Sequence, residues 1–280
     1  MRSWPTSERA SWPRAVDASP ARRALVDAGV APHEARWLLE EYAHDPGALA
    51  VAVERRLSGE PLQYVVGHWP FRSLDLVVDA RALIPRPETE WMVDVAWAQV
   101  RERATLRVLD LGCGSGAIGL ALADEARRRA VALTLVATDR SLDALALCAL
   151  NATRAHLAPT LVASNWFDEL DGAWRGSFDL VVTNPPYVSR AQWPALAAEL
   201  AFEPVDALVA ADTPAAEGFA DLAAIIASVR EWLVPDGVLV AEHGADQGGA
   251  ATQAARDAGF TRVSDYEDLA TRPRVLVASA

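Results

Sequence analysis

The fold of this chain is decided by the stretch RVLDLGCGSGAIG, residues 107–119. Its first five residues are mostly apolar and are typical of a buried strand, whereas residues 117–129 show the apolar spacing of a helix. Between them, three glycines alternate with other residues. Glycine has no Cβ, so the backbone of such a turn can approach a ligand closely. The stretch therefore predicts a strand, a ligand-binding turn and a helix, in that order.

Strands and helices continue to alternate after this stretch. The predicted strands are residues 107–111, 133–138, 178–183 and 238–242, and the predicted helices are residues 117–129, 142–152, 217–233 and 245–258. Buried runs that alternate with helices predict a parallel sheet covered on both faces. The last two predicted strands, 261–266 and 274–278, have no helix between them, so we expect them to pair antiparallel at an edge. The fold class is therefore α/β and Rossmann-like.

The chain before this sheet is organised differently. Residues 1–20 lack periodic apolar spacing and are expected to form a flexible tail. Residues 21–59 carry apolar side chains at helical spacing and predict a small helical domain. Residues 60–82 contain two short runs of β type, at 64–66 and 74–78, which predict a β-hairpin linker. The remaining residues, 83–280, are expected to form the catalytic domain.

Composition excludes several classes of protein. No run of about eighteen apolar residues and no secretory signal occurs, so we expect a soluble protein of the cytoplasm without a membrane partner. The net charge of −12 disfavours direct binding to nucleic acid. Two cysteines and the scattered residues His68, His156 and His243 lack the spacing of a metal site, so no metal is expected.

The glycine turn leaves two ligands open. Gly114, Gly116 and Gly119 satisfy the pattern G-x-G-x-x-G, and Asp139 follows at the spacing of an NAD site. However, Asp110 followed by three alternating glycines resembles the D-x-G-x-G-x-G turn of class I methyltransferases, which bind S-adenosylmethionine. The resemblance implies that Asp139 accepts hydrogen bonds from the two ribose hydroxyls. The residues that it places at the cofactor are Gly112, Cys113, Gly114, Ser115, Gly116 and Asp139.

The segment Asn184-Pro185-Pro186-Tyr187 follows a predicted buried strand, at the edge of the sheet where α/β proteins bind ligands. An amide nitrogen is a poor nucleophile because its lone pair is delocalised. The side-chain carbonyl of Asn184 and the backbone carbonyl of Pro185 can hold both amide hydrogens, while Tyr187 offers a face on which the planar group stacks. The prolines fix φ and stiffen the loop. We therefore expect catalytic roles for Asn184, Pro185 and Tyr187, and substrate contacts from all four residues, with Asn184 also touching the cofactor.

Four further segments distinguish among the enzymes that share this motif. They are RRLSGEPLQYVVG at 55–67, LIPRPETE at 83–90, FEPVDAL at 202–208 and EHGADQG at 242–248. With them, residues 20–280 resemble the release-factor glutamine methyltransferases. The resemblance implies a helical N-terminal domain that helps to recognise the partner, a β-hairpin linker and a class I methyltransferase domain. It also implies methyl transfer to N5 of the glutamine in the Gly-Gly-Gln loop of class I peptide-chain release factors.

Three residues near the expected site need individual interpretation. Trp166 is expected at the edge of the cofactor cleft, where its indole can pack on adenine. Arg86 either belongs to an ordinary helix start or positions the substrate backbone from a loop over the site. Asn165 replaces an acid that is often found in this family, which predicts weaker cofactor binding.

Two other functions remain as alternatives. One is methyl transfer to an amino group of adenine or guanine in nucleic acid, which the charge and the lack of a basic recognition domain oppose. The other is a non-catalytic scaffold that keeps the fold and binds a partner, which the intact segment 184–187 opposes.

Overall fold

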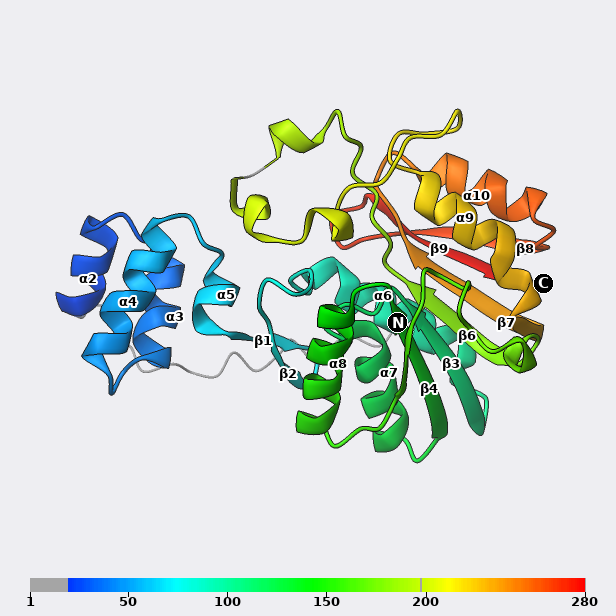
Figure 1. Cartoon of the computed structure of the whole chain (residues 1–280), viewed down its shortest axis with the longest axis horizontal. Helices are drawn as coiled ribbons and strands as arrows, with labels where there is room; N and C mark the ends of the chain where they lie inside the picture. Colours follow the sequence, from blue (N-terminus) through cyan, green and yellow to red (C-terminus); the bar gives the residue numbers. More distant parts are fainter. Residues whose placement is uncertain (1–19, 197, 280) are drawn as a thin grey trace. The chain divides into compact units, whose positions relative to one another are not determined.

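A computed structural model describes residues 20–196 and 198–279, so the predicted tail lies almost entirely outside the described residues. The chain divides into two units, with the boundary after Val66. Figure 1 shows the elements of both units in sequence colours. No helix of the described part is long and apolar enough to cross a membrane.

The N-terminal unit is helical. Its helices are α2 (Pro20–Asp27), α3 (Pro32–Glu41), α4 (Pro46–Leu57) and α5 (Leu62–Val66). Proline lies in the first turn of α3 and of α4, where its missing N–H costs nothing, and the Asp45 carboxylate accepts a hydrogen bond from the Ala48 N–H to cap α4. The buried side chains of Val30, Ala35 and Leu38 are part of the core of this unit.

The prediction of a strand at residues 64–66 is wrong, because these residues belong to helix α5. The Pro61 carbonyl accepts hydrogen bonds from the N–H groups of Tyr64 and Val65, which starts a helical turn. The Arg55 guanidinium donates hydrogen bonds to the Tyr64 carbonyl at 3.0 Å and to the Val65 carbonyl at 3.3 Å. Burial of the side chains and these tertiary bonds outweigh the β propensity of two adjacent valines.

A short hairpin opens the second unit. Strands β1 (His68–Phe71) and β2 (Leu74–Val77) pair antiparallel. The Ser73 hydroxyl donates to the buried Asp124 carboxylate at 2.6 Å, and the Val77 N–H donates to the Asn151 side-chain oxygen at 2.8 Å. The hairpin is therefore attached to the rest of the second unit through Asp124 and Asn151.

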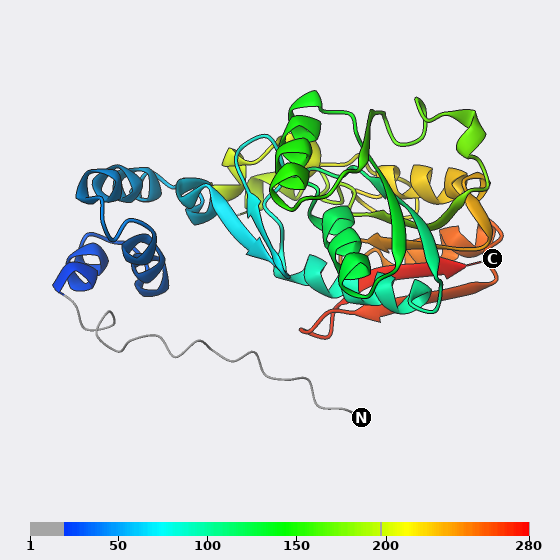
Figure 2. The ribbon, with the colours of Figure 1, turned by 90° about the horizontal axis from the view of Figure 1, so that it is seen from below.

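The core of the second unit is a seven-stranded sheet with the order β5-β4-β3-β6-β7-β9-β8. Its strands are β3 (Thr105–Leu111), β4 (Ala132–Asp139), β5 (Thr160–Ala163), β6 (Phe178–Thr183), β7 (Leu233–Glu242), β8 (Arg262–Glu267) and β9 (Pro273–Ser279). The first five in this order run parallel, whereas β9 pairs antiparallel with both β7 and β8. The predicted antiparallel pair is confirmed, and Figure 2 shows it along one edge of the sheet. Strand β5 was not predicted, because it has only four residues, none of them fully buried.

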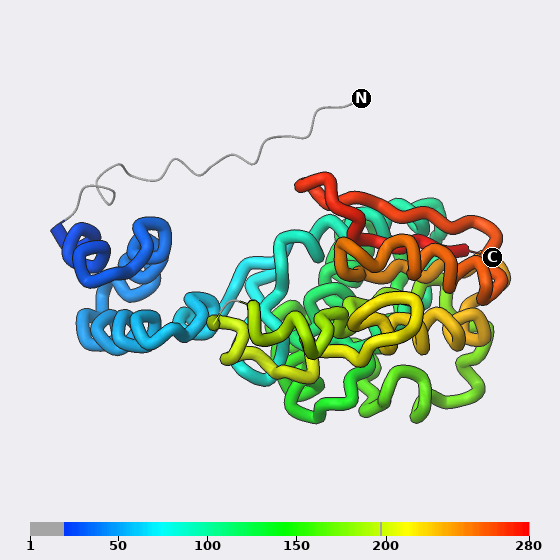
Figure 3. The backbone as a smooth tube through the Cα atoms, turned by 90° about the horizontal axis from the view of Figure 1, so that it is seen from above, coloured from blue at the N-terminus to red at the C-terminus, as the bar shows by residue number. Residues whose placement is uncertain are grey.

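Helices cover both faces of the sheet. They are α6 (Pro87–Val100), α7 (Ala117–Arg128), α8 (Leu142–Arg154), α9 (Ala220–Ser228) and α10 (Gly248–Asp257). Helices α9 and α10 lie side by side, as Figure 3 shows, and pack on side chains that alternate along the strands, such as Leu109, Leu111 and Val181. Helices α6 and α7 contact one another and the same central strands. The predicted α/β fold is thus confirmed.

The predicted helix at 217–233 is wrong at both ends. Helix α9 begins only at Ala220, since Gly218 has φ +60° and its Cα lies so close to the Tyr187 backbone that a Cβ would be 2.3 Å from that carbonyl oxygen. At the other end a short 3-10 turn leads into β7, which begins at Leu233 rather than at 238. The segment is shaped by tight packing against the 184–187 loop.

Candidate active site

Three strands end level with one another at one edge of the sheet. Leu111 of β3 is in register with Thr138 of β4 on one side and with Thr183 of β6 on the other. The Thr183 hydroxyl also donates to the Leu111 carbonyl at 2.9 Å. The residues that follow, Gly112, Asp139 and Asn184, therefore leave the sheet beside one another. The parallel topology brings the predicted cofactor and substrate residues to one place.

Three N–H groups of the glycine loop, residues 112–116, are hydrogen-bonded within the protein. The Cys113 N–H donates to the Thr138 carbonyl at 2.8 Å, the Gly114 N–H to Asp139 Oδ2 at 2.9 Å and the Gly116 N–H to the Cys113 carbonyl at 2.7 Å. A pyrophosphate site needs such N–H groups to point at the ligand. These contacts favour a ligand without a pyrophosphate over NAD.

Glycine is required at two positions of this region by close packing. Gly116 has φ +85°, and a Cβ there would lie 2.7 Å from the Cys148 Sγ atom. A Cβ on Gly119 would lie 2.7 Å from Asp110 Oδ2, the atom that accepts a hydrogen bond from the Gly119 N–H at 2.9 Å. Asp110 therefore ties the end of β3 to the first turn of α7.

Asp110 is fully buried, and burial raises its pKa to about 7, with the nearby charge of Asp139 as a further cause. The hydrogen bond from Gly119 acts in the opposite direction. The second carboxylate oxygen, Oδ1, is buried without a hydrogen-bond partner within residues 20–196 and 198–279. Asp110 thus supports the glycine loop from the protein interior and does not line the cavity at this edge of the sheet.

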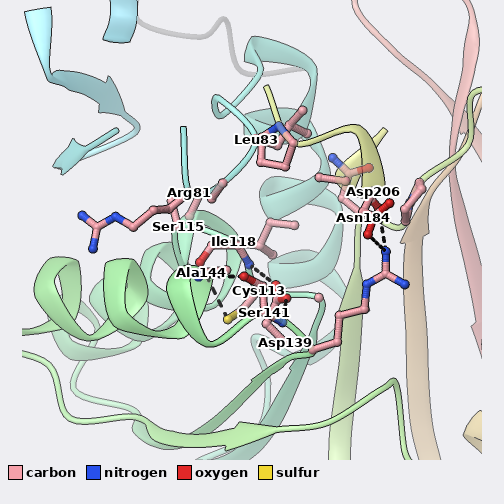
Figure 4. Close-up of a pocket in the computed structure, with 18 of the residues that line it drawn as sticks. Arg81, Leu83, Cys113, Ser115, Ile118, Asp139, Ser141, Ala144, Asn184 and Asp206 are labelled. Atoms are coloured by element: carbon pink, nitrogen blue, oxygen red, sulfur yellow. Dashed lines mark hydrogen bonds and ion pairs between the residues drawn. The ribbon is translucent and has the colours of Figure 1, made fainter. Parts of the chain in front are cut away.

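A cavity of about 690 Å³ lies at this edge of the sheet. Figure 4 shows Cys113, Ser115 and Asp139 on one side of it and Asn184 and Asp206 on the other. A volume of this order is typical of a site for a small organic ligand. The predicted site residues that line it are Arg86, Gly112, Cys113, Gly114, Ser115, Asp139, Trp166, Asn184 and Pro186. Gly116, Pro185 and Tyr187 are not among the lining residues.

Asp139 lies at the end of β4 with its carboxylate in place for a ligand. Oδ2 accepts the Gly114 N–H, and Oδ1 accepts the Ser141 N–H at 2.9 Å. Each carboxylate oxygen can accept more than one hydrogen bond, so both keep capacity for hydroxyl donors. The backbone bonds fix the orientation of the carboxylate at the cavity wall.

Trp166 lines the cavity beside the glycine loop. Its backbone has φ +51°, and its ring is so close to Gly112 that a Cβ there would be 3.1 Å from the indole Cζ3 atom. The indole hydrogen-bonds the side chain of Asp221, whose pKa is nevertheless raised by burial. Asn165, which also lines the cavity, donates from its side chain to Asp168 at 3.0 Å. Trp166 and Asn165 are thus neighbouring residues of the cavity wall.

Cys113 contributes a buried thiol to the same wall. Its pKa is raised well above the usual value by a hydrogen bond with the Cys148 side chain and by burial. Both cysteines are reduced. The Cys113 side chain therefore packs as a neutral group while its backbone shapes the loop.

The Asn184 loop, residues 184–187, presents an unpaired acceptor. The Oδ1 atom of Asn184 is buried, and it has no hydrogen-bond partner among the residues that the structure describes. An unsatisfied buried amide oxygen costs on the order of 1–3 kcal/mol, so native structures rarely keep one without a function. Because Asn184 lines the cavity, a ligand with an N–H donor can satisfy this atom.

Tyr187, the last residue of the Asn184 loop, is held by contacts with buried residues on the side away from the cavity. Its hydroxyl lies 3.5 Å from Glu242 Oε1, its ring lies 5.8 Å from the Arg274 guanidinium, and its carbonyl accepts from Gln247 Nε2 at 3.1 Å. Burial raises the pKa of the Tyr187 hydroxyl and also the pKa of Glu242. These contacts stiffen the loop from below, and the stacking role of Tyr187 stays a prediction.

Several residues of the four segments that carry the family resemblance have clear structural roles, although the sequence assigned them no individual role. Gln247 also donates to the Glu217 carbonyl at 2.7 Å and accepts from the Gly244 N–H at 3.0 Å, so it joins three segments. Glu203 accepts from the Ile84 N–H at 2.9 Å and pairs with Arg86. In the N-terminal unit, Arg55 and Glu60 form an ion pair. These residues belong to the segments at 55–67, 83–90, 202–208 and 242–248, but the sequence did not predict their hydrogen-bond partners.

No group of three or more His, Cys, Asp or Glu side chains is arranged to hold a metal ion in the described ranges. Of the histidines, His243 is fully buried, with its ring nitrogens at 2.8 Å from the Gly244 carbonyl and 3.0 Å from Asp265 Oδ1. It serves the packing of α10 and β8.

Known proteins resemble this chain in sequence. The family described as methyltransferase small domain matches residues 95–210. The release factor glutamine methyltransferase of Salmonella typhimurium is 42% identical over 231 residues, and that of Haemophilus influenzae is 38% identical over 236 residues. The enzyme of the same name from Escherichia coli is 40% identical over 230 residues. Each alignment covers 81% of this chain and 78% of the relative.

Solved structures resemble its fold. The catalytic domain of hMettl16 in complex with an RNA hairpin gives a TM-score of 0.57 at 13% identity, covering 83% of this chain and 81% of that one. A 16S rRNA N2 methyltransferase of T. Thermophilus, in complex with AdoMet and guanosine, gives 0.53 at 16% identity, covering 76% and 49%. At such identities these likenesses show the fold alone. The identity to the named relatives shows more: the chain belongs to the release factor glutamine methyltransferase family.

Proposed function

We propose that this protein transfers a methyl group from S-adenosylmethionine to N5 of the glutamine in the Gly-Gly-Gln loop of class I peptide-chain release factors. The observation that supports this best is the unpaired, buried Oδ1 atom of Asn184 in a residue that lines the cavity. The planar amide of a glutamine side chain carries two N–H donors. One of these can give Asn184 Oδ1 the hydrogen bond that it lacks.

The cavity fits S-adenosylmethionine. Its wall combines a glycine loop in which the N–H groups of Cys113, Gly114 and Gly116 are already bonded within the protein, the Asp139 carboxylate and the Trp166 indole. In the proposal, Asp139 accepts the ribose hydroxyls, Trp166 packs on the adenine, and the loop from Gly112 to Gly116 surrounds the methionine part. When bound, this cofactor supplies an electrophilic methyl group.

The residues of the chain orient the nucleophile. In the proposal, Asn184 Oδ1 accepts one amide hydrogen. The backbone carbonyl of Pro185, a residue whose side chain is buried and does not line the cavity, accepts the other, so that the nitrogen lone pair points at the methyl group. As positive charge develops on the nitrogen, both carbonyl oxygens stabilise it. The amide proton leaves after transfer, so no general base is needed beforehand. Catalysis is therefore mainly positioning and electrostatic stabilisation.

The helical unit is proposed to recognise the release factor. This assignment, to residues 21–59, follows from the family resemblance, and residues 60–82 are proposed to link it to the catalytic domain. Since the substrate takes part in translation, we place the enzyme in the cytoplasm. Nucleic-acid methylation is not favoured, because the named relatives act on release factors and the chain carries a net charge of −12.

The direct test uses the whole chain, S-adenosylmethionine labelled in its methyl group and a purified release factor. We expect label on one peptide, at the glutamine of Gly-Gly-Gln. A release factor with asparagine at that glutamine is the matched control and should stay unlabelled. Label in ribosomal RNA or DNA supplied in parallel, with none in the release factor, would overturn the proposal in favour of nucleic-acid methylation.

Removing the helical unit tests its proposed role. The cut belongs after Val66, so that the hairpin is kept, because Ser73 of the hairpin donates a hydrogen bond to the buried Asp124. We expect the shortened chain to bind S-adenosylmethionine with an affinity within about threefold of the parent and to methylate intact release factor at least roughly tenfold less efficiently. Circular dichroism verifies that the remaining unit is folded, and full activity on the intact factor would contradict the recognition role.

A further inference from the structure

One buried carboxylate joins two segments of the cavity wall that are far apart in sequence. The side chain of Glu203 is 1% exposed. Its Oε2 atom accepts from the Ile84 N–H at 2.9 Å, and its Oε1 atom pairs with the Arg86 guanidinium. The two partners precede Glu203 by 119 and 117 residues. We call this group of three residues the Glu203 clasp.

Both segments joined by the clasp line the same cavity. Residues 81–86 form one part of its wall, and residues 204–207, which follow Glu203 directly, form another. Arg86 is also the residue before helix α6, and its side chain is 28% exposed. A guanidinium carries five N–H donors, of which the bond to Glu203 uses one. Arg86 therefore has donors to offer at the cavity while the carboxylate fixes its position.

The clasp is strong because it is buried and charged. Charge-assisted hydrogen bonds are about twice as strong as neutral ones, and a buried carboxylate requires partners for its charge. Here one oxygen is bonded to a backbone N–H and the other to a cation, so both the Ile84 backbone and the Arg86 side chain are fixed by a single residue. Glu203 is not itself among the residues that line the cavity.

We infer that Glu203 is a positioning residue for the protein substrate: it holds Arg86 so that the guanidinium can bind the backbone of the glutamine loop beside Asn184. This inference rests on the proposed function, since it names the substrate contact of the same site. It develops the second interpretation of Arg86, in which the side chain positions the substrate. The cofactor is proposed to contact the glycine loop, Asp139 and Trp166, which lie on other segments, so we expect the clasp to affect cofactor binding little.

The test compares Glu203→Gln with the parent by steady-state kinetics on release factor. Glutamine keeps the size and one acceptor but loses the charge. We expect the KM for release factor to rise roughly 5- to 20-fold, with kcat changed less than about threefold and the Kd for S-adenosylmethionine within about twofold. Glu231→Gln, which removes a carboxylate from an exposed ion pair with Arg175 away from the cavity, is the matched control and should leave all three unchanged.

A double variant separates positioning from general stability. If Glu203 acts through Arg86, Glu203→Gln combined with Arg86→Gln should have the KM of Arg86→Gln alone. The reason is that Arg86→Gln already removes the guanidinium that Glu203 positions. Additive losses, or an unchanged KM in Glu203→Gln, would overturn the inference.

Hydrogen exchange measures the clasp without any activity. Backbone amides in residues 82–90 should exchange at least roughly fivefold faster in Glu203→Gln than in the parent, and unchanged exchange there would also overturn the inference. A parent enzyme that failed to methylate release factor would instead refute the proposed function, and the exchange result would still decide whether the clasp orders this wall.

Discussion

The glycine loop and the Asn184 loop are each associated with a buried side-chain oxygen atom that has no hydrogen-bond partner in the described part of the chain, but the two oxygens differ in kind. Below the glycine loop it is Oδ1 of Asp110, and in the other loop it is Oδ1 of Asn184. Asp110 belongs to a carboxyl group, which can take up a proton, and burial raises its pKa to about 7. Asn184 cannot titrate, so only a donor from another group relieves its oxygen.

Asp110 and Asn184 also differ in their access to the cavity. Asn184 lines the cavity and Asp110 does not. The glycine loop is also bonded to itself and to Asp139, whereas the Asn184 loop is supported from behind by Gln247 and leaves its acceptor unpaired. An unpaired buried oxygen therefore indicates a ligand contact only where the group cannot titrate and the cavity reaches it.

Replacing the Asn184 acceptor should have the largest effect. Asn184→Ala is expected to slow methyl transfer about 100- to 1,000-fold, by analogy with the roughly 3–4 kcal/mol lost when one oxyanion-hole donor is removed. The Kd for S-adenosylmethionine should change far less, because Asp139 and the glycine loop remain. Single-turnover kinetics with release factor measure the step, and a rate within threefold of the parent would remove the main support for the proposed chemistry.

Asn184→Asp sharpens the same comparison. It keeps an acceptor oxygen but makes the site titratable and adds a charge. We expect slower glutamine methylation and no methylation of DNA, measured in the same labelled assay. Parent-like rates with the aspartate would show that the neutrality of this acceptor is unimportant.

Asp139→Ala addresses the cofactor side. Loss of a charged acceptor for two hydroxyls is expected to cost roughly 1.5–3 kcal/mol of binding free energy, or about 10- to 150-fold in the Kd for S-adenosylmethionine. Calorimetry measures it directly. Asp139→Asn keeps one acceptor and should lose less, while an unchanged Kd in the alanine variant would contradict the ribose contact.

Asp110 predicts a pH dependence of stability. Because its pKa is near 7 when folded and about 3.8 when unfolded, the folded state binds the extra proton between these values, so this group lowers stability as pH rises from about 4 to 7. Asp110→Asn removes the titration. The free energy of unfolding of this variant minus that of the parent should therefore rise by at most about 1.4 kcal/mol between pH 5.5 and 6.5. Urea unfolding at the two pH values measures this difference, and a constant difference would place the pKa elsewhere.

The exposed ion pair between Arg140 and Asp206 should have the smallest effect. Its nitrogen and oxygen lie 3.0 Å apart, both residues line the cavity, and the side chains are 55% and 84% exposed. Such pairs contribute about 0.2–1 kcal/mol, so Arg140→Gln should change the Kd for S-adenosylmethionine less than about fivefold. The change should fade in 1 M salt. An effect as large as that of Asp139→Ala would show that Arg140 contacts the cofactor directly.

The sequence by itself determined most of the order of strands and helices in the catalytic domain, although not the short strand β5. It also determined the glycine loop and the position of Asn184 after a buried strand. These features are local: each is encoded within a dozen residues by apolar periodicity and by glycine and proline. Because parallel strands place their carboxyl ends at one edge, the sequence also placed Asp139 and Asn184 near the glycine loop, and the register of β3, β4 and β6 has them there.

Only the tertiary structure decided the partners of buried polar groups. The bonds from Glu203 to Ile84, from Asn151 to Val77 and from Gln247 to Tyr187 join residues 119, 74 and 60 positions apart. It also decided that residues 64–66 form a helix, since their carbonyls meet Arg55. A buried donor or acceptor must be satisfied, but any suitable group in space can do so, and periodicity along the chain carries no information about which one lies nearby.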